Sequence, residues 1–227
     1  GDAIHKGLHF GFFAGFASST AATASMGQRS KSDRGSALEA GAAAILANLA
    51  SLLLLGAVVW AVAPGLLLAT AAPLGMAVLV LLLGALIGLR RSLQQPVPEE
   101  TAPASARAFK LSHALLIALA IALVSIMAAW LRHLFGDTVA ILAAMLAALT
   151  ELQAAAVSIA RMATSGHMPQ TTAQWGLVGV LASGSTAKAT LALVSGSRSY
   201  GWYVALTLIT QVAAAAAVLA LMQGIWG

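Results

Sequence analysis

Cysteine is absent from this sequence and charged residues are scarce. Among its 227 residues there is no Cys, so disulfides, thiolate metal sites and cysteine nucleophiles are excluded. Charged residues make up 8% of the chain, whereas a soluble domain carries about 25%. The alternating ten-residue segments of an outer-membrane barrel are also missing. With 60% hydrophobic residues, the chain is interpreted as an integral membrane protein built from helices.

The beginning of the chain shows no secretory leader. The opening residues, "GDAIHKG", have no initial Met and no basic stretch followed by a cleavable apolar stretch, so a signal peptide is not recognised. We therefore expect the chain to be one piece of a longer protein.

Long apolar runs dominate the sequence and reach the length of a spanning helix, roughly 18 residues or more. Their leucine- and alanine-rich composition favours helices over strands. Glycine, proline or charge separates neighbouring runs. The prediction is an all-α, polytopic transmembrane helical bundle of about seven spans. These lie at residues 8–27, 37–62, 65–89, 111–132, 138–160, 174–195 and 201–225.

One polar stretch divides these runs into two groups. The segment "RRSLQQPVPEETAPASARAFK" contains three prolines and little apolar character, which is typical of a linker. The predicted organisation is a first transmembrane half at residues 1–92, a cytoplasmic linker at 93–110 and a second transmembrane half at 111–227.

The net charge of +5 suits either nucleic-acid binding or a membrane protein, in which basic residues collect in cytoplasmic loops. If the predicted spans alternate in direction, eight Lys and Arg lie on one face and three on the other. This bias favours the membrane interpretation and no nucleic-acid partner. It predicts an external amino terminus and a cytoplasmic carboxyl terminus. The larger group is Arg29, Lys31, Arg34, Arg90, Arg91, Arg107, Lys110 and Arg161, and the smaller is Lys6, Arg132 and Arg198.

Two hydroxyl-rich clusters interrupt the apolar runs, "ASSTAAT" at residues 17–23 and "ASGSTAKAT" at 182–190. At about 1.5 Å per residue, both lie near the middle of their spans. Since four predicted spans separate them, the two segments should run in opposite directions, as an inverted repeat with interrupted helices does in secondary transporters. The alternative is that small residues and hydroxyls let helices pack closely, each hydroxyl bonding to its own backbone.

Three further polar residues lie far from any predicted span end: Asn48, Glu151 and Lys188. A charge at a helix centre costs about 2.5–3.5 kcal/mol even on insertion scales, so such residues face a partner or a cavity. Glu151, with Thr150 and Gln153 within the same turn, suits a hard cation or a proton, or is a neutral acid bonded to a neighbouring helix. Lys188 either pairs with Glu151 or extends to the external interface. Asn48 either joins helices or lines a site.

The sequence resembles the DUF4010 membrane domain, which in many bacterial proteins follows an MgtC/SapB-type domain. The resemblance rests on "GFFAGFASSTAATASMGQRSKSD", "FKLSHALLIALAIALVSIMAAWL", "LAALTELQAAAVSIARMATSG" and "GVLASGSTAKATLALVSGSRSYG". It implies that Glu151 is the first of an acidic pair and that Lys188 is the family's lysine. Gln153 replaces the second acid, and Gly184 stands where an asparagine is expected. The association implies a link to magnesium or other cations.

These observations predict a secondary transporter or ion pathway in the bacterial inner membrane, most simply for a divalent metal such as Mg²⁺ or coupled to protons. An anion carrier is the alternative chemistry. A regulatory or structural module that binds another membrane protein, an MgtC/SapB-type domain or a second copy of the chain, is the alternative function. An enzyme is not expected, because no His or Asp lies near a span centre, and no cofactor is expected beyond a transported metal. The predicted ion-binding residues are Ser18, Ser19, Thr20, Thr23, Asn48, Glu151, Gln153, Ser183, Ser185, Thr186 and Lys188, with Glu151 as the metal ligand.

Overall fold

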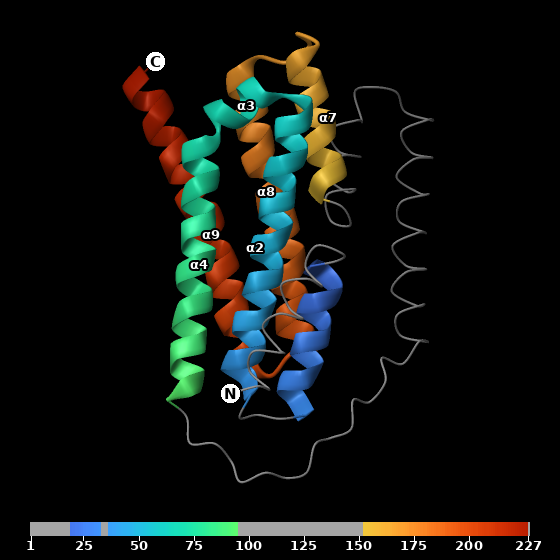
Figure 1. Cartoon of the computed structure of the whole chain (residues 1–227), viewed down its shortest axis with the longest axis vertical. Helices are drawn as coiled ribbons and strands as arrows, with labels where there is room; N and C mark the ends of the chain where they lie inside the picture. Colours follow the sequence, from blue (N-terminus) through green and yellow to red (C-terminus); the bar gives the residue numbers. More distant parts are fainter. Residues whose placement is uncertain (1–18, 33–35, 95–151, 227) are drawn as a thin grey trace.

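The computed structural model describes residues 19–32, 36–94 and 152–226, and every regular element within these ranges is a helix (Figure 1). The all-α prediction is therefore confirmed for this part of the chain. A helix at residues 19–32 comes first. It is followed by α2 (Ala37–Val62), α3 (Pro64–Ala69), α4 (Ala71–Leu93), α7 (Leu152–Thr164), α8 (Gln170–Ser195) and α9 (Arg198–Trp226).

Four of these helices, α2, α4, α8 and α9, are long and apolar enough to cross a membrane. They confirm the spans predicted at residues 37–62, 65–89, 174–195 and 201–225, with shifted ends. Their alanine and leucine content gives high helix propensity, and in lipid a helix satisfies every backbone hydrogen bond internally. The described residues do not include the predicted span at 111–132, most of the one at 138–160, or the linker beyond residue 94. A total of seven spans is therefore not confirmed.

Two predicted boundaries are wrong. The first helix continues through "QRSKS" to residue 32, because Gln, Arg and Lys favour helix once the chain has left the apolar core. The third apolar run is two helices, α3 and α4, joined at Thr70. Pro73 lacks the N–H that a continuous helix would need there, so α4 begins anew at Ala71 with Pro73 in its first turn.

Helix α2 occupies the centre of the bundle. About two thirds of its spanning window, 67%, is buried, against 33–50% for the other three spans. Helices α4, α7 and α9 all pack on it, and α8 packs on α7 and α9. The Tyr203 ring of α9 fits against Gly41 of α2 and Gly88 of α4, where any Cβ would collide with it. Small residues at these positions bring three helices close together.

The two ends of the bundle differ in charge. Helix 19–32, α4 and α8 end at one of them, and α2 and α9 begin there (Figure 1). We call this end the basic face. The opposite end, which we call the distal face, contains α3, the turn at residues 165–169 and the end of α9. The described basic residues near the basic face are Arg29, Lys31, Arg90, Arg91 and Arg198, and the one near the distal face is Arg161.

The predicted alternation of spans fails from α7 onward. Helix α7 ends at the distal face, where Ala163 and Thr164 adjoin Ala63 and Pro64, although the prediction put this end with the cytoplasmic loops. Arg161 and Arg198 therefore exchange faces, and α9 ends at the distal face. Counting apolar runs assumes that each one crosses the membrane. Helix α4 ends at the basic face and α7 ends at the distal face, whereas two full spans between them would put both ends at the same face.

The predicted inverted relation between the two hydroxyl clusters is also wrong. Helix 19–32 and α8 run parallel and end together: Lys31 Nζ donates to the carbonyl of Val194 at 2.8 Å, and the N–H of Ser197 donates to Ser30 Oγ at 2.9 Å. Nor does the second cluster interrupt its helix, since α8 is continuous from Gln170 to Ser195. Hydroxyls such as Thr186 Oγ1, which donates to the Ala182 carbonyl at 2.8 Å, bond within the helix instead of breaking it.

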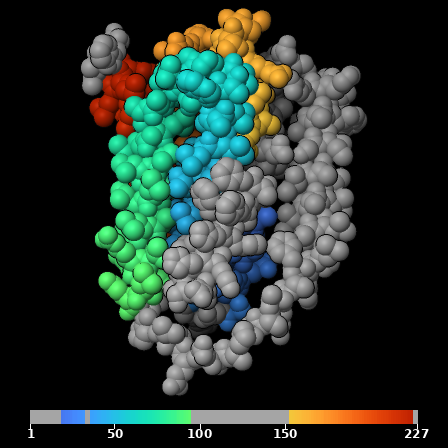
Figure 2. Space-filling view, viewed as in Figure 1, coloured from blue at the N-terminus to red at the C-terminus, as the bar shows by residue number. Residues whose placement is uncertain are grey.

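The outer surfaces of α4 and α9 are apolar. In the space-filling view, α4 runs along one edge of the molecule (Figure 2). Trp60, Trp175 and Trp202 are 42–52% exposed near helix ends, where interfacial tryptophans lie in membrane proteins. This surface fits a lipid environment. Its exposed aliphatic residues include Leu79, Leu82, Leu83, Leu86 and Ile87 of α4 and Leu206, Ile209 and Leu221 of α9.

Candidate functional site

Buried polar side chains gather at mid-length in the spanning helices. A few other buried polar residues, such as Thr70, lie near helix ends and do not belong to this group. The remaining ones come from helix 19–32, α2, α8 and α9, so one polar zone extends across the bundle. We call it the polar layer. Its members, each no more than 8% exposed, are Ser19, Thr23, Asn48, Ser51, Ser185, Lys188 and Gln211.

Thr23 and Asn48 connect helix 19–32 to the centre of α2. Asn48 Nδ2 donates to Thr23 Oγ1 at 3.3 Å and to the carbonyl of Ala44 at 2.8 Å. Thr23 Oγ1 in turn donates to the carbonyl of Ser19 at 2.8 Å. Asn48 therefore joins two helices, as one of its two predicted roles required. The first hydroxyl cluster lies at the depth of the α2 midpoint.

Ser51, one turn after Asn48 on α2, connects the layer to α7. Gln153 Nε2 donates to Ser51 Oγ at 3.3 Å, so the first turn of α7 lies at mid-depth. From there α7 reaches the distal face in 13 residues, a rise of roughly 20 Å. Residues three apart on a helix share a face, so Asn48 and Ser51 present a polar stripe toward both neighbouring helices.

Ser185 and Gln211 join α8 to α9 in the same layer. Gln211 Nε2 donates to Ser185 Oγ at 2.8 Å, and both side chains are buried. Gln211 Oε1 is also buried and has no hydrogen-bond partner among the described residues. Exchanging the amide oxygen and nitrogen would only leave the nitrogen unpaired instead. A buried polar atom without a partner is rare. The described part of the layer therefore lacks one hydrogen-bond donor, next to Gln211.

Lys188 is the only charged side chain in the described part of the chain that lies away from the helix ends. It is 8% exposed, so it does not extend to an interface, which was one of its two predicted states. No described residue forms an ion pair or a hydrogen bond with its amine. It shares the buried face of α8 with Ser185, and side chains on a helix lean toward its amino-terminal end. The Lys188 side chain therefore leaves α8 on its buried face, in the direction of Ser185.

The depth of Lys188 follows from the parallel packing of α8 and helix 19–32. Their hydrogen-bonded pairs are separated by 163 and 167 positions, which places Lys188 level with residues 21–25, the region of Thr23. On the other side, Ile159 of α7 packs on Gly176 of α8. Because α7 and α8 run antiparallel across a short turn, the beginning of α7 falls within about two turns of Lys188.

The remaining predicted site residues are less central. Thr20, Gln153 and Ser183 are half-buried, and Thr186 lies on the exposed side of α8. Thr186 and Ser185 belong to the same sequence cluster, but they point to different sides of α8, since neighbouring residues on a helix face different ways. Ser18 and Glu151 lie outside the described residues, and Glu151 is the predicted metal ligand. No group of three or more His, Asp or Glu forms a metal cluster among the residues described.

Sequence reasoning missed three residues of this region: Ser51, Gln211 and Tyr200. The Tyr200 hydroxyl donates to the carbonyl of Thr23 at 2.6 Å, and its side chain is fully buried. A glutamine at mid-span was a usable signal for Gln211, by the same argument that singled out Asn48. Nothing in the sequence marked Tyr200, because its partner is a backbone atom in a distant helix.

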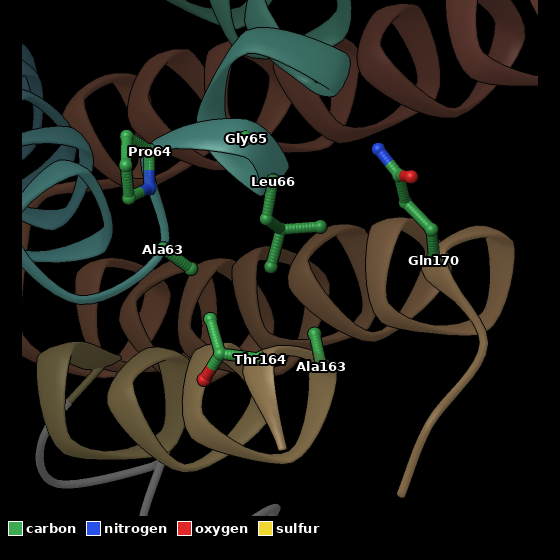
Figure 3. A pocket seen from close by; sticks show the side chains of 7 residues that line it. All are labelled: Ala63, Pro64, Gly65, Leu66, Ala163, Thr164 and Gln170. Carbon is green, nitrogen blue, oxygen red and sulfur yellow. The ribbon is translucent and has the colours of Figure 1, made fainter. Parts of the chain in front are cut away.

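A cavity of about 200 Å³ lies at the distal face, away from the polar layer. Ala63, the first turn of α3, the end of α7 and Gln170 line it. Figure 3 shows Leu66 projecting toward Ala163 and Thr164. Thr164 Oγ1 already donates to backbone carbonyls of its own helix. With apolar walls and few free polar groups, this cavity is a poor ion site.

Comparison with known protein families gives one match. Residues 5–196 match the family described as "Domain of unknown function (DUF4010)". The chain belongs to the DUF4010 family. The matched range includes every described helix from helix 19–32 to the end of α8, and it ends at Gly196, just before α9. No curated protein and no solved structure matches the chain.

Proposed function

We propose that this DUF4010 protein is a membrane transporter or ion pathway and that the polar layer is its binding site. The observation that carries the proposal is Lys188, a lysine buried at mid-depth with no acidic partner among the described residues. A charge in that position is costly and marks a functional site by default. Polar groups from four helices converge at the same depth, as they do at the sites of secondary transporters.

The favoured substrate is a cation, either a divalent metal such as Mg²⁺ or a proton that drives another movement. Glu151 directly precedes Leu152, the first described residue of α7. The beginning of α7 lies near Ser51 and within about two turns of Lys188. In this mechanism Glu151 and Lys188 neutralise each other in the empty protein. An entering cation binds the carboxylate and displaces the amine toward Gln211.

An anion is the second candidate substrate, and a separate observation favours it. The one charge in the described part of the layer is positive, and the groups around it are hydroxyls and amides. Lys188 with the Ser185 hydroxyl and the Gln211 amide can donate several hydrogen bonds to a small oxyanion. The two candidates differ in whether Glu151 is required.

The charge distribution supports an orientation in the bacterial inner membrane. Basic residues collect in cytoplasmic loops, so we place the basic face in the cytoplasm and the distal face outside. This orientation keeps the predicted cytoplasmic position of Arg29, Lys31, Arg90 and Arg91. It places the end of α9 outside, opposite to the sequence-based prediction.

Flux into proteoliposomes tests the proposal. The purified chain would be challenged with Mg²⁺, other divalent and monovalent cations, and small oxyanions, with a pH-sensitive dye inside the vesicles. We expect cation flux that Glu151→Gln lowers by roughly tenfold or more. Flux of an oxyanion that survives Glu151→Gln would select the anion carrier. If a folded protein moves none of these ions, the transport proposal is wrong.

A further inference from the structure

Helix 19–32 and α8 are fastened together at the basic face, on one side of the polar layer. We call this contact the clasp. Each helix contributes residues from its last turns or from just beyond its end, and both hydrogen bonds in it join residues more than 160 positions apart. The clasp consists of Gly27, Ser30 and Lys31 from the first helix and Val194, Ser195 and Ser197 from the end of α8.

Two polar contacts close the clasp. Lys31 Nζ donates to the carbonyl of Val194, 2.8 Å away. This carbonyl lies in the last turn of α8, where carbonyls lack partners within the helix and a cation is favourable. The N–H of Ser197 donates to Ser30 Oγ at 2.9 Å. Water can replace the protein partner in both contacts, so they can open without leaving a buried group unpaired.

Gly27 seals the space between these contacts. A Cβ atom on Gly27 would lie 3.1 Å from the backbone N of Gly196 and would collide with the Ser195 hydroxyl. No side chain and no ion fits between the helices at this point. Tyr200 extends the seal toward the polar layer, because its hydroxyl bonds to the Thr23 carbonyl and its ring is fully buried.

Ser195 indicates that the closed clasp is one of two arrangements. Its Oγ is buried and has no hydrogen-bond partner among the described residues. This hydroxyl belongs to the last residue of α8 and would be hydrated if the helices parted. The closed state therefore leaves a polar atom unsatisfied that an open state would satisfy.

The position of the clasp gives it control over access to the site. Lys31 lies roughly 12 Å beyond Thr23 along helix 19–32, and Ser197 lies a similar distance beyond Lys188. Any ion passing between these two helices from the polar layer to the basic face must cross the clasp. We propose that the clasp is the basic-face gate of the ion pathway, closed in this structure and opened when helix 19–32 parts from α8. This inference rests on the proposed transport function.

Cysteine cross-linking tests the gate, and the chain is suited to it because it contains no cysteine. In Ser30→Cys/Ser197→Cys, oxidation should join the two sides of the clasp. We expect flux to fall roughly tenfold on oxidation, because a gate that cannot open limits turnover, and to recover on reduction. The control is Gly84→Cys/Thr207→Cys, which joins α4 to α9 where Thr207 Cγ2 lies 2.6 Å from a Cβ built on Gly84. Oxidation of the control should leave flux unchanged. Unchanged flux in a fully cross-linked clasp overturns the gate.

A labelling experiment separates failure of the gate from failure of the transport proposal. Ser195→Cys places a thiol in the clasp where the native Oγ has no partner to lose. A membrane-impermeant maleimide added at the basic face should label it slowly. Adding Lys31→Met and Ser30→Ala should speed labelling roughly tenfold, because both clasp hydrogen bonds are then lost. Labelling that does not change while flux persists would refute the gate. Faster labelling in a protein with no flux would support the opening of the clasp and reject the transport function.

Discussion

Tyr200 donates its phenolic hydrogen to the backbone carbonyl of Thr23, 2.6 Å away and 177 positions earlier in the chain. The bond links the first turn of α9 to helix 19–32 at the edge of the polar layer. One turn later, the Tyr203 hydroxyl donates to the carbonyl of Gly84 on α4. Two tyrosines on one helix thus bond to backbone atoms of two different helices. They position α9 against both.

Removing the Tyr200 hydroxyl should weaken this link without creating a cavity. Tyr200→Phe is expected to lower the free energy of unfolding by about 1 kcal/mol, since the hydroxyl is buried and its bond is lost. Thermal unfolding in detergent measures the change. Thr23→Val is the informative comparison, because it removes the hydroxyl bonded to Ser19 and Asn48 but keeps the carbonyl that Tyr200 uses. An unchanged melting temperature for Tyr200→Phe would contradict the assigned bond.

Lys188→Met should separate function from stability. Methionine retains much of the length of lysine but no charge. Its proposed partner Glu151 can take up a proton once the lysine is gone, which avoids an unpaired buried charge, so we expect little loss of stability. Flux should nevertheless fall by roughly tenfold or more. The matched control is Thr186→Val, on the exposed side of the same helix, which should change flux little. A loss of both stability and flux in Lys188→Met would indicate a structural role for the lysine.

Two glycines on α2 should respond to alanine in opposite ways. A Cβ at Gly41 would lie 2.7 Å from the Tyr203 ring, whereas nothing lies within 4 Å of one at Gly56. Gly41→Ala should destabilise the protein by about 1–3 kcal/mol through overpacking. Gly56→Ala should be neutral or slightly stabilising, because alanine has the higher helix propensity. Unfolding measured side by side tests the pair. Equal effects would mean that α2, α4 and α9 do not meet as described.

The direction of α9 is tested by reporter fusion. A reporter attached after Trp226 should lie on the opposite side of the membrane from one inserted after Arg91, because α4 ends at the basic face and α9 ends at the distal face. Alkaline phosphatase, active only outside the cytoplasm, should be active at the first position and inactive at the second. Activity at neither position or at both would contradict this topology. The sequence-based alternation predicts that neither is active.

Residue patterns predicted some of the site and not the rest. Asn48, Thr23, Ser185 and Lys188 were recognisable because a polar side chain in the middle of an apolar run needs a partner, whatever the fold. Thr186 matched the same pattern but lies on the exposed side of α8. Its hydroxyl is satisfied by its own helix, so composition does not distinguish it from Ser185. Which side of a helix is buried depends on its neighbours.

The sequence by itself determined that the helices need a lipid environment. It also determined the helical class, the position of four spans and the depth at which polar groups occur. These follow from local quantities: the length of an apolar run, helix propensity and distance from a span end. Only the tertiary structure decided that helix 19–32 and α8 run parallel, that Gln211 and Tyr200 meet the hydroxyl clusters, and that Gly27 closes on Ser195. Direction and pairing depend on contacts between different helices, some of them more than 160 positions apart in the chain, and hydrophobicity along a chain contains no information about them.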